Sequence, residues 1–159
     1  MKITIAAVGR QKAGPERELA ERYVERASAA GRKLGLGVAV REFPESRAGD
    51  APTRKSQEST ALLDALPERG ILVALDEGGR ALDSRAFAER IGKWRDDGVE
   101  ALVLAIGGAD GHGDKLIARA DLRLAFGPMT WPHQLVRLML AEQLYRAVTI
   151  LAGHPYHRD

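Results

Sequence analysis

Short apolar runs alternate with longer amphipathic segments along the chain. The apolar runs are rich in valine, isoleucine and leucine and show little polar alternation, which is typical of strands that are buried on both faces of a parallel sheet. The predicted strands cover residues 3–8, 38–43, 71–75, 102–106 and 122–126.

The amphipathic segments between these runs have the spacing of helices. In residues 83–97, for example, Phe87, Ile91 and Trp94 fall on one helical face. Helices are expected at residues 15–30, at 60–66 with an extension back to 53, at 83–97, at 114–120, and in a long apolar stretch that ends before Gly153. Residues 44–53 are rich in Pro, Gly, Ser, Arg and Asp and are expected to form a mobile loop.

The regular alternation of strands and helices predicts an α/β fold with a mostly parallel sheet and helices on both faces. The length of 159 residues fits one domain, residues 1–159. The first residues are too short an apolar run for a signal peptide, and no stretch is long enough to span a membrane, so a cytoplasmic location is expected. The net charge of +2 permits a polyanionic partner without requiring one.

Several predicted strands end in glycine or proline, at the edge where open α/β sheets bind ligands. These exits follow Leu75, Ile106 and Phe126, and we expect them to share one pocket. Gly108 and Gly113 have the spacing of a Walker A pair, but Asp114 stands where lysine is required. An acidic residue there repels phosphate, so a neutral or cationic cofactor held by backbone groups is expected.

Other catalytic chemistries have little support in the residues. The chain has no cysteine, which excludes thiolate catalysis, and it has no G-x-S-x-G elbow for a serine nucleophile. His154 and His157, with Asp159 nearby, are spaced like metal ligands, yet no partner motif accompanies them. No metal site is therefore predicted.

The last part of the chain gathers histidines, a tyrosine and arginines at the two ends of one long apolar helix. Together with the glycine-rich segment after residue 106, it resembles the ribosomal large subunit methyltransferase H family, over the whole chain. The motifs that carry the resemblance are Gly107-Gly108-x-x-Gly111, Met129-Thr130-x-Pro132-His133-Gln134-x-x-Arg137, Glu142-Gln143-x-Tyr145-Arg146-Ala147 and His154-Pro155-Tyr156-His157-Arg158.

The resemblance implies a SPOUT-superfamily enzyme with a C-terminal trefoil knot, working as a homodimer. Such enzymes transfer a methyl group from S-adenosylmethionine to N3 of a pseudouridine in 23S rRNA. The cofactor contacts that the resemblance implies are Leu75, Gly108, Gly127, Pro128, Met129, Thr130, Trp131 and Pro132. The sequence departs from common family forms at Gly127, where serine is frequent, and at Trp131, where leucine or phenylalanine is usual.

Methylation of a ring nitrogen also requires that the nitrogen lose its proton. His133, Tyr156 and His157 are the candidate proton acceptors or relays, and Arg158 is the candidate for stabilising the deprotonated base or holding phosphate. Our hypothesis places Tyr156 and Arg158 at the reacting base, with His133 closing the pocket.

Structural roles for these residues remain open alternatives. Thr130 is a possible cap for the helix in which His133 occupies the first turn, and Tyr156 is a possible packing aromatic. Arg137 and Arg146 are expected in ion pairs or dimer contacts, and Trp131 in the pocket wall. Two other functions stay open: a SPOUT methyltransferase acting on tRNA, and a cofactor- or RNA-binding module without activity.

Overall fold

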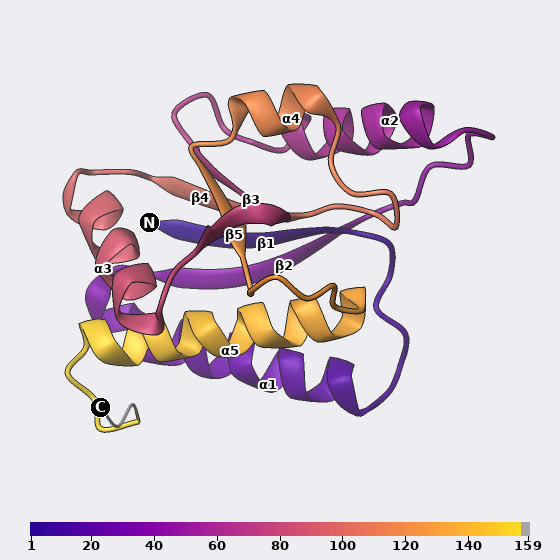
Figure 1. Cartoon of the computed structure of the whole chain (residues 1–159). Helices are drawn as coiled ribbons and strands as arrows, with labels where there is room; N and C mark the ends of the chain where they lie inside the picture. The colour runs from indigo at the N-terminus through magenta and orange to yellow at the C-terminus, as the bar shows by residue number, and fades with distance from the viewer. Residues whose placement is uncertain (157–159) are drawn as a thin grey trace.

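The computed structural model of the chain describes residues 1–156, and its strands and helices alternate in the predicted order (Figure 1). The elements are β1 (Lys2–Val8), α1 (Pro15–Gly31), the 3-10 turn η1 (Arg32–Leu34), β2 (Gly37–Phe43), α2 (Ala51–Asp64), β3 (Ile71–Ala81), α3 (Ser84–Asp96), β4 (Ala101–Ile106), α4 (Asp114–Arg119), β5 (Leu122–Ala125) and α5 (His133–Leu151).

The strands form a five-stranded sheet in the order β2-β1-β4-β3-β5, and every neighbouring pair is parallel. β4 lies at the centre, and its residues Leu102 and Leu104 are fully buried. The expectation of a mostly parallel sheet is therefore confirmed. The order is also consistent with the C-terminal knot that the resemblance implies.

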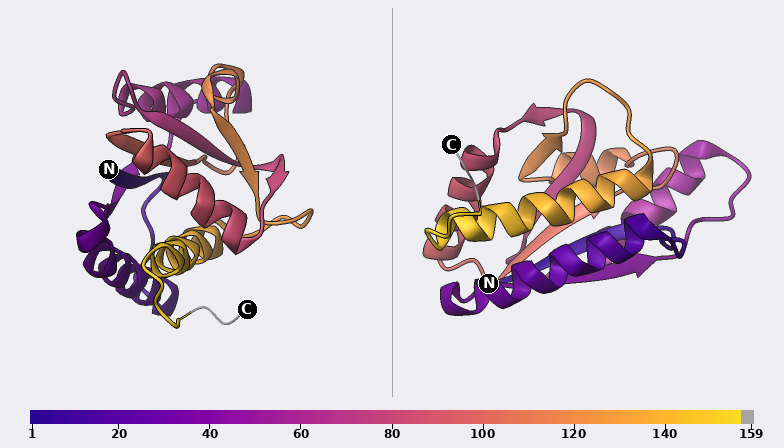
Figure 2. Two further views of the ribbon diagram at one scale, coloured as in Figure 1. Left: turned by 90° about the vertical axis from the view of Figure 1, so that its left-hand side faces the viewer. Right: turned by 90° about the horizontal axis from the view of Figure 1, so that it is seen from below.

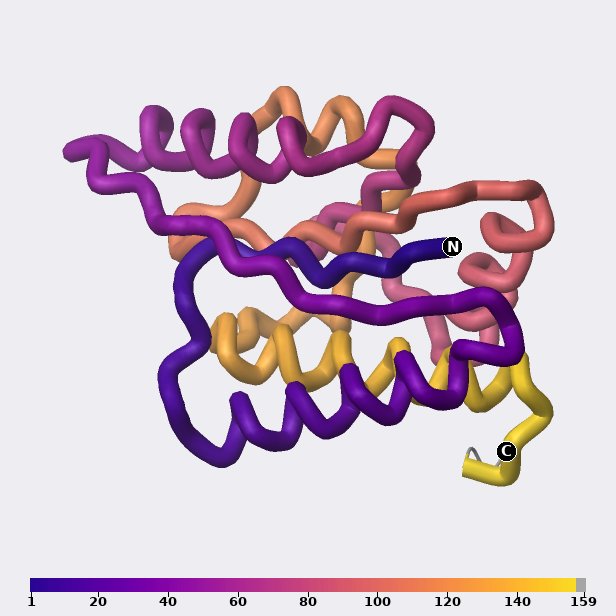
Figure 3. Tube along the Cα trace, turned by 180° about the vertical axis from the view of Figure 1, so that it is seen from behind, coloured from indigo at the N-terminus to yellow at the C-terminus, as the bar shows by residue number. Residues whose placement is uncertain are grey.

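Helices cover both faces of this sheet, as the sequence predicts. One apolar cluster joins the sheet to α1, α3 and α5, and a second joins it to α2 and α4. Figures 1 and 3 show α2 and α4 on one side and α1 and α5 together on the other. In Figure 2 the first and last helices run side by side along that face.

Two predicted boundaries are wrong. Helix α2 begins at Ala51, because the side chain of Asp50 accepts a hydrogen bond from the Thr53 amide at 2.8 Å and Pro52 occupies the first turn. Part of the predicted loop is thus helical. Strand β3 continues to Ala81 after an irregularity in which Leu75 and Arg80 both pair with Leu124.

The irregularity in β3 explains why the strand was expected to end early. Residues 76–79 bulge away from the ladder and carry acidic side chains and glycines, which in sequence resemble a loop. A Cβ at Gly79 would come within 2.7 Å of the Arg123 backbone. Glycine is therefore required where the bulge crosses β5, and pairing resumes beyond it.

Arg137 ties α5 to the carboxyl ends of β1 and β2. Its side chain is 6% exposed, donates to Glu42 at 2.8 Å, and also donates to the carbonyl oxygens of Val8 and Gly9. Arg146 pairs with Glu142 one turn away on α5 at 2.7 Å. The expectation that both arginines form ion pairs is confirmed.

Candidate active site

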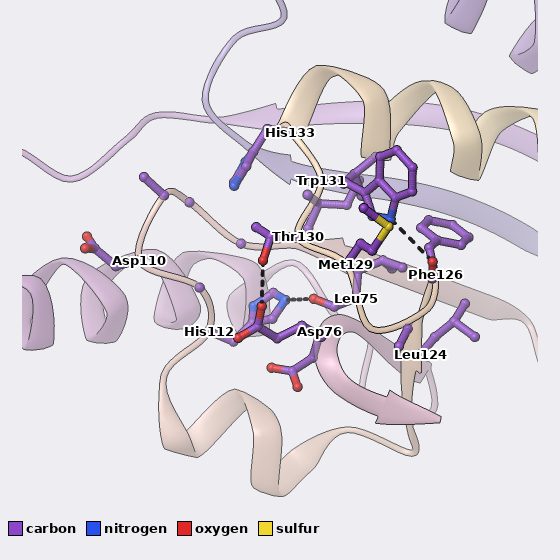
Figure 4. Close-up of a pocket in the computed structure, with 18 of the residues that line it drawn as sticks. Leu75, Asp76, Asp110, His112, Leu124, Phe126, Met129, Thr130, Trp131 and His133 are labelled. Atoms are coloured by element: carbon purple, nitrogen blue, oxygen red, sulfur yellow. Dashed lines mark hydrogen bonds between the residues drawn. The ribbon is translucent and has the colours of Figure 1, made fainter. Parts of the chain in front are cut away.

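A cavity of about 360 Å³ opens at the carboxyl edge of the sheet, where three loop segments meet. It is lined by residues 75–77, 106–112, 124–127 and 129–131, with Lys55, His133 and Val136. Figure 4 shows side chains from these segments converging on one space. The prediction that the three strand exits share a pocket is therefore confirmed.

Most of the residues that the resemblance assigns to the cofactor line this cavity. Leu75, Gly108, Gly127, Met129, Thr130 and Trp131 are in its wall, and His133 joins them from the start of α5. Pro128 and Pro132 belong to the same segment but do not line the cavity. Trp131 is 37% exposed and forms part of the rim, so its expected place in the pocket wall is confirmed.

The segment between β5 and α5 is held by its own side chains. Gly127 has φ 95°, a conformation that favours glycine. The indole Nε1 of Trp131 donates to the Phe126 carbonyl at 3.3 Å, and the Thr130 hydroxyl donates to Glu77 at 3.3 Å (Figure 4). Thr130 therefore does not cap α5, whose first turn follows Pro132 without a side-chain cap.

The glycine-rich segment after β4 is held by helix α2. The Gly113 amide donates to the Ser59 hydroxyl at 2.7 Å. Arg54 donates to both carboxylate oxygens of Asp110, from Nε at 2.7 Å and from Nη2 at 3.2 Å. A helix distant in the sequence thus sets the position of a loop that lines the cavity.

The cavity wall carries three carboxylates and one lysine, Lys55. The Arg54 guanidinium holds the pKa of Asp110 below its usual range, mainly through their hydrogen bond. Burial raises the pKa of Asp76, but its hydrogen bond and charge interaction with Arg123, 2.7 Å away, leave that pKa lowered overall. Both groups are therefore ionised at neutral pH, and Glu77 adds a third carboxylate.

His112 is a cavity residue to which the sequence assigned no role. Its side chain is buried, and its Nε2 lies 3.1 Å from the Leu75 carbonyl oxygen (Figure 4). Burial lowers its pKa despite the opposing effects of the Leu75 carbonyl and Asp76. The ring is therefore neutral at pH 7 and, with a proton on Nε2, supports the end of the regular part of β3 by hydrogen bonding to Leu75.

We expect the stability of the protein to fall as the pH is lowered below about 6.5, partly because of His112. The unfolded chain binds a proton near the usual value of 6.5, whereas the folded chain does so only at lower pH. The stabilisation is complete above that value and is lost as pH falls toward the folded pKa. Urea unfolding between pH 7.5 and pH 5 measures the effect.

His112→Gln keeps a donor for Leu75 but does not titrate, so its stability should depend less on pH than that of the wild type. His133, whose pKa is also lowered by burial, is the control: His133→Gln should remove a separate part of the dependence. If His112→Gln and the wild type lost the same stability between pH 7.5 and pH 5, the proposal that His112 is buried in its neutral form would be refuted.

The described part of the C-terminal tail, residues 154–156, does not line the cavity of its own chain. The Tyr156 hydroxyl donates to Glu142 at 3.3 Å, and its ring centroid is 4.5 Å from that of Tyr145. The Arg146 guanidinium lies 5.2 Å from the centroid of the same ring. Burial and a hydrogen bond with Tyr23 raise the pKa of Tyr156, which keeps its hydroxyl protonated here. His157 and Arg158 lie outside the described residues.

Within residues 1–156, no group of three or more His, Cys, Asp or Glu side chains is placed to hold a metal ion. No helix in that part of the chain is both long and apolar enough to cross a membrane.

The chain as a whole matches a known protein family. A family model described as "Predicted SPOUT methyltransferase" matches residues 1–157. The chain belongs to this SPOUT methyltransferase family. The prediction that the chain is a methyltransferase is confirmed by this membership, and S-adenosylmethionine is the methyl donor of SPOUT methyltransferases.

Similar curated proteins share the name "Ribosomal RNA large subunit methyltransferase H". One from Bradyrhizobium diazoefficiens is 57% identical over 159 residues, covering 99% of each chain, and one from Brucella anthropi is 58% identical over 160 residues, covering 100% of each. The family resemblance predicted from the motifs is therefore confirmed.

A crystal structure of the SpoU methyltransferase AviRb from Streptomyces viridochromogenes, in complex with AdoMet, matches with a TM-score of 0.41 and 12% identity. The match covers 96% of this SPOUT family chain and 61% of that chain.

Proposed function

We propose that this protein methylates N3 of a pseudouridine in the 23S rRNA of the large ribosomal subunit, with S-adenosylmethionine as the donor. The proposal is supported by relatives that are named as ribosomal RNA large subunit methyltransferases and that match this chain over nearly its whole length. The observation that carries it is the cavity itself, because it joins the three strand exits and most of the expected cofactor residues. The ribosomal substrate makes the cytoplasm the proposed location.

The cavity suits a cofactor that combines a positive charge with an apolar ring system. Asp76, Glu77 and Asp110 provide carboxylates, and Leu75 and Phe126 provide apolar surface. Its volume of about 360 Å³ is within the usual range for small-molecule sites. When bound, S-adenosylmethionine supplies an electrophilic methyl group on a positively charged sulfur.

His133 is proposed to close the cavity and to serve as one candidate proton acceptor. Its side chain is half-buried in the cavity wall. Burial, followed by the nearby charge of Arg137, lowers its pKa, so the ring is neutral and able to accept a proton near pH 7. Tyr156, His157 and Arg158 are proposed to act at the reacting base from the tail.

A homodimer is part of this proposal, because the tail must reach a cavity that residues 154–156 do not line in their own chain. A second hollow of about 650 Å³ lies among α1, α3, β5 and α5, and Leu19, Leu138 and Met139 are among its lining residues. Leu19 is 37% exposed. We infer that a second copy covers this apolar surface and that each tail serves the partner's cavity.

The test is methyl transfer from radiolabelled S-adenosylmethionine to ribosomes that carry or lack the pseudouridine. We expect one methyl group per large subunit when pseudouridine is present, located to that nucleotide by mass spectrometry, and much less when uridine replaces it. Much of the rate comes from holding the ring nitrogen in line with the methyl group. Free rRNA, offered as a third substrate, therefore tests whether the assembled subunit is needed to position the nucleotide.

Two outcomes would replace this proposal. Methylation of tRNA but not of ribosomes would indicate the alternative SPOUT activity. Cofactor binding by calorimetry without methylation of any RNA offered would indicate a binding module.

A further inference from the structure

Glu58 is a buried carboxylate behind the cavity wall. It lies on α2 and is 6% exposed. Its Oε1 accepts a hydrogen bond from the Ser46 amide at 2.9 Å. Its Oε2 is buried and has no hydrogen-bond partner among the described residues. A bare carboxylate oxygen in a protein interior is costly, so a role beyond packing is indicated.

The bare oxygen of Glu58 points at the loop that lines the cavity. A Cβ at Gly108 would collide with that oxygen, so the carboxylate fills the space where a side chain of residue 108 would project. Gly108 itself is in the cavity wall. The absence of a side chain at residue 108 therefore lets the negative charge approach the cavity to within the thickness of the backbone.

Glu58 also lies close enough to His133, a residue of the cavity wall, to interact with it electrostatically. Burial and the charge of Arg137 lower the pKa of His133, and the charges of Glu45 and Glu58 oppose that shift without overcoming it. Arg54 is a cation that interacts with Glu58, but its guanidinium is engaged by both oxygens of Asp110 and by the Ala48 carbonyl. Asp76 and Asp110 each have an arginine partner, whereas Glu58 forms no ion pair with any residue in 1–156.

We propose that Glu58 is a specificity-determining residue that makes the cavity favour the cationic methyl donor over its neutral product. This inference rests on the proposed cofactor. In the transfer, the proton of the ring nitrogen passes to a base, for which His133 is one candidate. The bond between methyl carbon and sulfur breaks, its electron pair stays on sulfur, and the deprotonated nitrogen forms the new bond to carbon. The product is a neutral thioether, S-adenosylhomocysteine. A buried negative charge nearby attracts the sulfonium and not the thioether, which favours exchange of product for new donor.

The test is the ratio of dissociation constants for S-adenosylhomocysteine and S-adenosylmethionine, measured by calorimetry on the full chain. Glu58→Gln keeps the shape and the acceptor for Ser46 but removes the charge. We expect the ratio to fall about five- to tenfold, the size of effect that one charge exerts across a partly screened interior. If Glu58 had a purely structural role, its replacement would weaken the binding of both ligands equally and leave the ratio of dissociation constants unchanged.

Two further variants complete the design. Glu58→Asp keeps the charge but loses packing contacts. This variant should bind both ligands more weakly, while its ratio of dissociation constants stays near that of the wild type. Asp64→Asn is the matched control, because it removes one negative charge from an exposed position at the end of the same helix and should change neither constant. Thermal unfolding of each variant reports whether it is folded, and Glu58→Ala provides a second neutral variant if Glu58→Gln does not fold.

The outcomes separate this inference from the proposed function. If the wild type binds S-adenosylmethionine and the ratio is the same in the wild type and the neutral variants, the role of Glu58 is refuted while the proposed function stands. If the wild type binds neither ligand, the proposed cofactor is refuted and the inference fails with it. A lower ratio in the neutral variants, with Glu58→Asp and Asp64→Asn near the wild type, supports it.

Discussion

Removal of residues 154–159 is expected to reduce methyl transfer by about a hundredfold or more, the usual contribution of acid–base groups, while affinity for S-adenosylmethionine stays within about twofold. Affinity should be kept because the tail is proposed to act at the reacting base, whereas the proposed cofactor contacts belong to other segments of the chain. Tyr156 contacts Glu142 and Tyr145 on α5 and does not line the cavity. Single-turnover methylation of ribosomes and calorimetry with the cofactor measure the two quantities.

The truncated chain should still fold and form dimers. Helix α5 ends at Leu151, and the Gly153 amide that closes its last turn by donating to the Ile150 carbonyl is retained. Size-exclusion chromatography with light scattering checks this. A monomeric or unfolded product would contradict the proposal that residues 154–159 act only in catalysis and are not needed for folding or dimer formation.

Arg158→Ala narrows the same test to one side chain, with Tyr156→Phe as its companion. Arg158→Ala should lower methylation far more than cofactor binding, because its proposed target is the reacting base. An equal loss of both would remove Arg158 from that role.

Replacement of Arg137 by methionine is expected to destabilise the folded state by about 3 kcal/mol, since it breaks a buried ion pair and leaves groups of the sheet unpaired. Glu42 and the carbonyl oxygens of Val8 and Gly9 would each lose a donor. For a chain of this length the melting temperature should fall by roughly 6–12 °C. Urea unfolding and calorimetry give the two values.

Arg17→Met is the matched control for this prediction. Arg17 pairs with Glu21 at 2.8 Å, but its side chain is 48% exposed, so water replaces the lost partner and little change is expected. A similar loss of stability in the two variants would mean that the buried interactions of Arg137 stabilise the fold no more than the exposed ion pair of Arg17.

The strands could be predicted because short continuous apolar runs, bounded by turn residues, are typical of buried parallel strands. The continuation of β3 could not, since Asp76 to Gly79 have the composition of a turn and only the neighbouring β5 restores the pairing. The start of α2 was predictable in principle. Asp50 and Pro52 are ordinary signals for a helix start, but the surrounding polar residues indicated a loop.

The pocket could be predicted because the carboxyl ends of parallel strands always meet at one edge. The groups behind its wall could not be predicted. Glu58 and Ser59 reach the glycine loop only through the packing of α2, and no spacing in the sequence links residue 58 to residue 108. Likewise, the motif that contains Tyr156 indicated a catalytic role for this residue, but it did not predict that the ring packs against Tyr145.

The pairing of the first and last helices has a consequence for how the chain folds. The apolar face of α1 is covered by α5, more than a hundred residues later in the sequence. In a chain emerging from the ribosome, the surface of α1 that α5 covers therefore stays exposed until nearly all of the chain has been synthesised. Folding that waits for such distant contacts is slow and exposes apolar surface meanwhile, so newly made chains should depend on chaperones more than their small size suggests.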